Sequence, residues 1–170
     1  MDFLQLAKER YSVRDFLKKI VPDEIVSKIV EAGYVAPTAC NKQPLRITVV
    51  KSEEGLERFR KCTECHYDAS LAFIVSYDKD MDWIRPYDGR NSGDIDASIV
   101  ATHMMLEAAS LGIGATWVMH FIPEAIKVEF EFPDNLEPVV VLPMGYPSEE
   151  ASPGKLHSKY RNYNDVIDIV

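Results

Sequence analysis

The chain alternates between segments with helical hydrophobic spacing and short, strongly apolar segments. The segments that predict helices cover residues 2–9, 23–33, 53–60, 94–111 and 123–130. The apolar runs that predict strands cover residues 46–51, 71–77, 115–120 and 138–144. Four strands of similar length that alternate with helices predict an α/β or α+β domain. The pattern leaves the strand order open.

Three segments depart from this regular pattern. Residues 81–93 are polar and aromatic with proline and glycine, which predicts a loop. The helix at residues 94–111 is apolar on nearly every side, so we expect burial on several sides, with His103 as a core or interface residue. Residues 146–170 are polar and irregular, so they cannot form a core alone. We therefore expect one domain, residues 1–170, with an extended C-terminal arm over residues 146–170 that lies on the body or on a partner subunit.

The composition is that of a soluble globular protein. Of the 170 residues, 46% are hydrophobic and 27% are charged. The formal net charge of −8 and the pI near 5.0 argue against a nucleic-acid or anionic-membrane surface. Apolar runs stay shorter than a membrane span, and the N-terminus lacks a basic leader. With three cysteines, an odd number, the chain is expected to be cytoplasmic.

A basic stretch follows the first predicted helix in this acidic chain. Arg10, Ser12 and Arg14 place two guanidinium groups around a hydroxyl within five residues. Guanidinium groups offer a planar fork of donors that suits phosphate and polarised carbonyl oxygens. The stretch therefore predicts an anion site, although the solvated end of an ordinary helix would give the same residues.

A second polar stretch lies between two prolines, Pro37 and Pro44, which hold it as a loop. Its polar members, Thr38, Asn41 and Gln43, belong to no periodic pattern. Because polar loop residues on a rigid scaffold often hold ligands, this loop is a second candidate for a binding site.

Cys62, Cys65 and His66 fit the C-x-x-C-H spacing of c-type haem attachment. Haem attachment usually requires export, and a zinc site would need Cys40 brought to the same place. A redox pair is a further alternative. We expect structural thiols here, and the redox, zinc and haem alternatives stay open.

Taken in order, these stretches resemble the FMN-dependent nitroreductase family. The matching segments are RYSVR at 10–14, APTACNKQPLR at 36–46, DAS at 68–70 and 96–98, LGIGATW at 111–117, MGYP at 144–147 and KYR at 159–161. The resemblance implies a three-layer α+β fold around a mainly antiparallel sheet. It also implies a homodimer that exchanges its C-terminal arms and binds two FMN molecules at the interface, each touched by both subunits.

The resemblance further implies a set of FMN-binding residues. They are Arg10, Tyr11, Ser12 and Arg14 from one subunit, Pro37, Thr38, Ala39, Asn41 and Gln43 from the other, Val118, Met119 and His120 beside the flavin ring, and Lys159 and Arg161 in the tail. Lys159 and Arg161 would join Arg10 around the phosphate, and Arg14 would lie at the N1/O2 edge of the ring. Family members often carry small residues where Met119 and His120 stand. Two alternatives stay open here: the larger side chains narrow the pocket, or the backbone N–H groups still face flavin N5 and O4.

The implied activity is that of a flavoprotein oxidoreductase with a ping-pong mechanism. FMN would take hydride from NADH or NADPH and pass electrons to a nitroaromatic, a quinone or a similar small acceptor. No protein side chain is needed as a nucleophile, and His120 is the one candidate proton donor. Two alternatives remain: a non-catalytic flavin-binding or sensing dimer, and a metal or haem module at Cys62, Cys65 and His66.

Overall fold

A computed structural model of the chain describes residues 2–170. One antiparallel sheet runs in the order β1-β2-β4-β3. The strands are β1 (Leu45–Val50), β2 (Leu71–Asp78), β3 (Gly114–Ala115) and β4 (Leu136–Gly145). The α-helices are α1 (Phe3–Glu9), α2 (Asp23–Tyr34), α3 (Glu53–Arg60), α4 (Gly93–Ser110) and α5 (Pro123–Glu129). Short 3₁₀ turns cover Ala39–Asn41, Glu64–His66 and Tyr163–Asp165.

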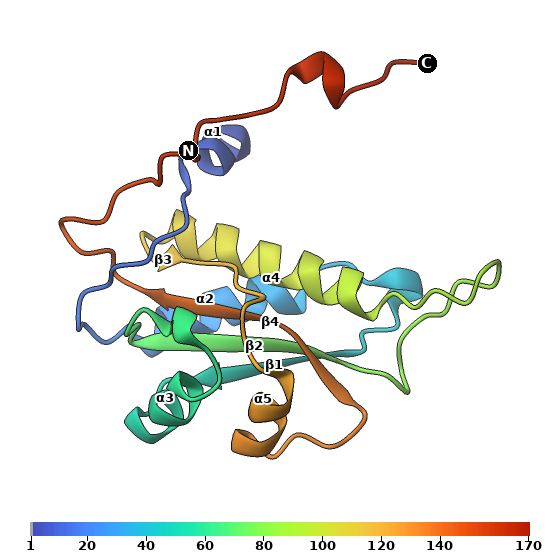
Figure 1. Cartoon of the computed structure of the whole chain (residues 1–170), viewed down its shortest axis with the longest axis horizontal. Helices are drawn as coiled ribbons and strands as arrows, with labels where there is room; N and C mark the ends of the chain where they lie inside the picture. The colour runs from blue at the N-terminus through green and yellow to red at the C-terminus, as the bar shows by residue number, and fades with distance from the viewer. Residues whose placement is uncertain (1) are drawn as a thin grey trace.

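The sheet lies between two layers of helices (Figure 1). Alternate residues of β2 face opposite layers, so Phe73 packs with α2 and α4 while Ile74 packs with α3 and α5. Both faces of β2 and β4 are therefore covered, which explains why these strands are continuous apolar runs in the sequence. The arrangement confirms the expected three-layer α+β fold with an antiparallel sheet.

Helix α4 is buried along one side only. Val100, Ala101 and Met104 are fully buried against the sheet, whereas Ile95 on the outer side is 47% exposed. His103 is half-buried and lines an outer depression with Ile95. The expectation of burial on several sides, with His103 as a core residue, is therefore wrong for the single chain, and the interface alternative stays a prediction.

The strand expected at residues 115–120 is much shorter. Only Gly114–Ala115 pairs as a strand with β4, and one further bridge joins Val118 to Val141. Between these points, the Thr116 N–H donates to the Pro143 carbonyl at 3.2 Å. Because proline has no N–H, Pro143 cannot return the hydrogen bond, and the ladder breaks there.

The helix predicted at residues 23–33 is α2, which continues to Tyr34, so Gly33 does not end it. Gly33 is buried inside the helix, and a Cβ atom there would lie 2.8 Å from Met104 Cγ and 2.9 Å from Ile47 Cδ1. The glycine therefore allows α2 to approach α4 and β1 closely.

The C-terminal tail leaves β4, passes α1 and extends away from the three layers (Figure 1). Its first residues pair with the chain's own N-terminal segment, through a bridge between Phe16 and Pro147. Beyond this point Tyr160 and Ile169 are exposed, at 78% and 93%. No helix between residues 2 and 170 has the length and apolarity needed to cross a membrane.

Candidate functional site

Residues 10–14, which we call the strap, are held by the edge of the sheet. Ser12 forms a parallel bridge with Ala115, and the Val13 N–H donates to the Ala115 carbonyl at 3.1 Å. The Thr116 hydroxyl donates to the Val13 carbonyl. Val13 is buried with Phe16 and Ala69, half-buried Arg10 lies against Met105 of α4, and Arg14 is exposed.

The strap lies unusually close to β3. A Cβ atom on Gly114 would lie 2.7 Å from Val13 Cγ2 and 2.8 Å from Val13 Cβ. Val13 is β-branched and cannot easily turn away from such a contact. The glycine is therefore what lets the strap reach the sheet edge and set the direction of its arginines.

The two strap arginines are not neutralised by the contacts they make. Half-buried Arg10 places Nη1 3.2 Å from Met105 Sδ, and exposed Arg14 donates from Nη1 to the Ser12 carbonyl at 3.3 Å. A thioether and a carbonyl are uncharged, and the thioether is a weak acceptor. Arg10 also lines a cavity of ≈ 190 Å³ together with Met105 and Ile113. Arg10 therefore lies at a small cavity that Glu9 also lines, and Arg14 lies four residues further along the strap.

The loop between Pro37 and Pro44 carries three residues with left-handed backbones. Cys40, Asn41 and Gln43 have φ of 50°, 53° and 50°. Such angles are unfavourable for residues other than glycine, least so for asparagine. The Gln43 N–H donates to Thr38 Oγ1 at 3.0 Å. The exposed side chains of Asn41 and Gln43 are therefore presented from a locally fixed backbone.

A buried carboxylate holds the middle of this loop. Asp96, in the first turn of α4 and only 2% exposed, accepts the Ala39 N–H at 2.9 Å through Oδ1. Its other oxygen, Oδ2, accepts the Ser92 hydroxyl at 2.8 Å. The loop is thus fastened to the N-terminal end of α4.

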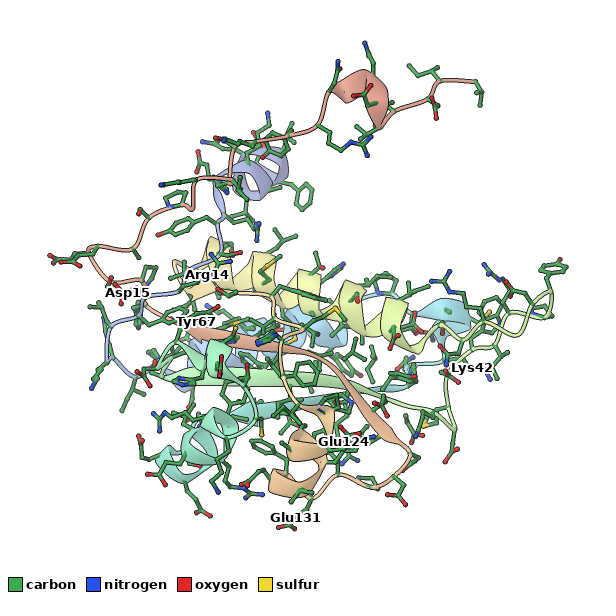
Figure 2. The ribbon with its side chains drawn as sticks, viewed as in Figure 1. Arg14, Asp15, Lys42, Tyr67, Glu124 and Glu131 are labelled. Atoms are coloured by element: carbon green, nitrogen blue, oxygen red, sulfur yellow. The ribbon has the colours of Figure 1, made fainter. Side chains whose placement is uncertain are left out.

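The strap and the loop do not meet in one chain. The loop is fixed near Asp96, whereas the strap and its cavity lie beside Met105 and Ala109, toward the other end of α4. A helix of 18 residues such as α4 is about 27 Å long. Figure 2 shows Arg14 and Lys42 at opposite ends of the molecule. The single chain therefore presents two separate half-sites.

The segment expected beside the flavin ring is partly buried and partly open. Val118 is buried and bridged to Val141, while Met119 is 68% exposed and His120 is exposed. The His120 carbonyl accepts the Thr63 hydroxyl at 2.5 Å, so this segment is tied to the residue that precedes the 3₁₀ turn Glu64–His66. The role of His120 as a proton donor stays a prediction.

Tyr67 joins the strap end of the site, although the sequence pattern did not single it out. It packs against Val13 and Phe16, and it lies on the same side of the molecule as Arg14 (Figure 2). Burial raises the pKa of Tyr67, hydrogen bonding with Cys65 raises it further, and Arg14 lowers it. Tyr67 has a left-handed φ of 49°, which nothing in its local sequence signals.

The C-x-x-C-H residues have their own structural partners. Cys62 is fully buried, and its thiol donates to the Arg58 carbonyl at 3.4 Å. Burial, with a smaller effect of the nearby Glu129 carboxylate, raises the pKa of Cys62 to about 11, so its thiol is unreactive at neutral pH. His66 Nδ1 accepts the Asp68 N–H at 3.0 Å. Among residues 2–170, no three His, Cys, Asp or Glu side chains are grouped to hold a metal ion.

The two basic tail residues lie in the exposed part of the arm. Lys159 and Arg161 are both exposed, and Arg161 Nη2 donates to the Asp165 carbonyl at 3.3 Å. The tail does pass the strap, because the rings of Tyr11 and His157 meet edge-on at 6.3 Å. The Tyr11 hydroxyl also donates to the Ala151 carbonyl at 3.2 Å. The convergence of Lys159 and Arg161 with Arg10 on one phosphate stays a prediction.

Comparisons with known proteins agree with this architecture. The nitroreductase family model matches residues 7–70 and 64–146. A Methanothermobacter thermautotrophicus protein, named provisionally as an NADH dehydrogenase/NAD(P)H nitroreductase, is 34% identical over 88% of this chain and 79% of its own length.

Two solved structures have the same fold. A nitroreductase family protein from Clostridium difficile 630 is 41% identical, with a TM-score of 0.93 over 99% of this chain and 98% of that one. An FMN-dependent nitroreductase from Clostridium difficile R20291 is 24% identical, with a TM-score of 0.74 over 96% of this chain and 94% of that one. Since the family model covers most of the sequence, the chain belongs to the nitroreductase family.

Proposed function

We propose that the protein is an FMN-dependent oxidoreductase that uses NADH or NADPH to reduce a nitroaromatic, a quinone or a similar small acceptor. Membership of the nitroreductase family supports the class of reaction. The observation that carries the choice of cofactor is the strap, which presents Arg10 and Arg14 with no charge opposing them in their own hydrogen bonds.

The donors of the strap fit the chemistry of FMN. The phosphate of FMN is a dianion, and charge-assisted hydrogen bonds from guanidinium groups are strong. Arg10 would hold the phosphate with Lys159 and Arg161, and Arg14 would hold the ring edge. When bound, FMN supplies the redox chemistry, because its ring accepts a hydride from a nicotinamide and passes electrons to a second substrate. The protein's own part is to bind, orient and charge-stabilise the cofactor.

The separation of the two half-sites supports a homodimer. Strap and loop lie toward opposite ends of α4, and the outer side of that helix leaves Ile95 exposed. A second copy packed on this side about a two-fold axis would bring its loop to the first copy's strap. Each FMN would then be bound by Arg10, Ser12 and Arg14 of one subunit and by Thr38, Asn41 and Gln43 of the other.

The first experiment measures flavin and electron transfer directly. Purified protein, reconstituted with FMN, is titrated anaerobically with NADH and separately with NADPH while flavin absorbance is followed. We expect bleaching by at least one nicotinamide and recovery of the absorbance on adding a nitroaromatic or a quinone. Failure to bind FMN would contradict the proposal. Bound FMN that neither nicotinamide reduces would favour a flavin-sensing dimer instead.

The second experiment tests the strap. Arg14→Ala is expected to weaken FMN binding by roughly tenfold to a hundredfold, since a hydrogen bond to a charged group contributes about 1.5–3 kcal/mol. It should also make the flavin harder to reduce. Lys28→Ala, which removes a partly exposed cation from α2, is the matched control and should leave the FMN dissociation constant unchanged. Equal FMN affinity in the two variants would remove Arg14 from the site.

The third experiment tests whether two chains share each site. Arg14→Ala and Asn41→Ala homodimers are prepared separately and then mixed under conditions that exchange subunits. A mixed dimer contains one site with an intact strap and an intact loop, so about a quarter of wild-type activity should return if each site spans two subunits. No recovery after verified exchange would show that each chain builds its site alone.

A further inference from the structure

The loop between Pro37 and Pro44 keeps a backbone that its sequence does not favour. Cys40, Asn41 and Gln43 all have positive φ, and the segment has no glycine to relieve them. Residues persist in such conformations only where the surrounding structure fixes them. The contacts that fix this loop therefore decide whether its side chains are presented in one geometry.

Asp96 makes a side-chain contact to the middle of the loop from outside it. Its carboxylate accepts the Ala39 N–H at 2.9 Å and the Ser92 hydroxyl at 2.8 Å, so both oxygens are engaged. Asp96 lies 57 residues away in sequence, on α4, and is 2% exposed. A buried carboxyl group with a donor on each oxygen forms a stronger and more directional anchor than an exposed one.

The surroundings of Asp96 make this an unusual place for a carboxylate. Asp96 lies close enough to Asp82 for its carboxylate to raise the pKa of Asp82, and one oxygen of Asp82 is buried without a hydrogen-bond partner in the described chain. Two neighbouring acids oppose each other's ionisation. A neutral residue at position 96 would avoid that repulsion, so packing alone does not explain the aspartate.

We propose that Asp96 is a positioning residue for the flavin site: by holding the Ala39 amide, it fixes the loop that presents Thr38, Asn41 and Gln43 to the cofactor. The role rests on the proposed function, because the loop matters to binding only if it reaches FMN. Asp96 acts through the backbone of the loop and does not itself touch the cofactor.

The test compares three variants that treat the same hydrogen bond differently. Asp96→Ala removes the acceptor. Asp96→Asn keeps an oxygen for Ala39 and an amide group for Ser92. Ala39→Pro removes the donor instead, and it suits a first 3₁₀ position after Thr38, whose φ of −130° and ψ of 157° are the extended geometry that precedes proline.

Two quantities are measured in each folded variant: the FMN dissociation constant and the hydrogen exchange of the backbone N–H groups within residues 38–43. Asp96→Ala and Ala39→Pro should each raise the dissociation constant by about tenfold and speed exchange in the loop. The double variant should be no worse than either single one, because both remove one interaction. Asp96→Asn should restore slow exchange and an affinity within about threefold of wild type.

Several outcomes would overturn this role. One is an Asp96→Ala variant with wild-type hydrogen exchange and FMN affinity. Another is a double variant whose loss of FMN affinity is the sum of the two single losses. The third is an Asp96→Asn variant that binds FMN as weakly as Asp96→Ala. If Asp96→Ala does not fold, Ala39→Pro and Asp96→Asn decide the question alone. If wild-type protein binds no FMN, the proposed function fails, while the exchange rates still show whether Asp96 holds the loop.

Discussion

The strap and the loop present polar side chains by different physical means. The strap is joined to β3 through the backbone of Val13 and Ala115, as an added piece of sheet. The loop is held at its end by a backbone bond from Asp78 of β2 to the Pro44 carbonyl, and in its middle by side-chain oxygens of Thr38 and Asp96. The strap is thus held by a backbone bond at the sheet edge and one hydroxyl, whereas the middle of the loop is held by individual side-chain oxygens.

This difference decides what each half-site tolerates. Backbone ladders form with any side chain that fits, so the strap depends on close packing against Gly114 more than on any one polar group. A loop held by two side chains loses its geometry when either one changes. Substitutions that alter packing should therefore harm the strap, and substitutions that remove one hydroxyl or carboxylate should harm the loop.

The largest effect is expected from Gly114→Ala. The new Cβ atom would lie 2.7–2.9 Å from three carbons of Val13, which is too close for stiff side chains. Overpacking of this kind costs about 1–3 kcal/mol of unfolding free energy, and it should also loosen the strap. Urea unfolding and FMN titration measure the two effects.

Gly154→Ala is the matched control, because a Cβ atom at Gly154 meets nothing within 4 Å. Its stability and FMN affinity should stay at the wild-type values. Should Gly114→Ala match it in both measurements, the strap would not depend on packing, and the contrast with the loop would disappear.

The sequence predicts the regular elements well where the pattern is local. The helix expected at residues 53–60 occupies Glu53–Arg60, with Ser52 capping the amide of Gly55. The strand expected at 71–77 is β2, one residue longer. These elements are determined by capping residues and apolar runs that lie within a few residues of each other, so one sequence is enough to predict them.

The features that shape the site depend on residues far apart in the sequence. The break after β3 depends on Pro143, which no pattern around residues 115–120 reveals. The left-handed positions of the loop are not glycines, so the sequence does not indicate their conformation. Asp96, which holds the loop, lies in another element. In the sequence, Asp96 is part of the DAS segment at 96–98 that matches the family, and no local pattern assigns it a role. The resemblance to the family identifies the candidate FMN-binding residues. From local chemistry alone, Arg10, Ser12 and Arg14 could equally be the solvated end of a helix.

A smaller effect is expected from Thr38→Val, which tests the loop's internal cap. Valine keeps the shape of threonine but leaves the Gln43 N–H without its acceptor, now at 3.0 Å. Loss of one such hydrogen bond costs about 0.5–1.5 kcal/mol, so FMN should bind roughly threefold to tenfold more weakly. Thr48→Val in β1, where valine suits the strand, is the control. An unchanged affinity in Thr38→Val would mean that the bond from Gln43 to Thr38 does not set the geometry in which the loop binds FMN.

The smallest effect is expected from Asp82→Asn, which changes the charge beside the loop's anchor. Burial, then the Asp96 and Asp78 carboxylates, raises the pKa of Asp82. A carboxyl with a raised pKa in the folded state binds its proton more tightly there, so the stability that this proton brings is present at low pH. That stability is lost as the pH rises through the folded-state pKa.

At pH 7 the wild-type protein therefore bears an unfavourable charge that the asparagine variant lacks. Asp82→Asn should be more stable at pH 7, by no more than about 1 kcal/mol because the side chain is only partly buried. The gain should shrink as the pH falls toward the ordinary aspartate value of about 4. Urea unfolding of both proteins between pH 4 and pH 8 measures the difference. A gain that does not vary with pH would mean that the amide makes a new contact, and that the charge on Asp82 does not oppose the charge on Asp96.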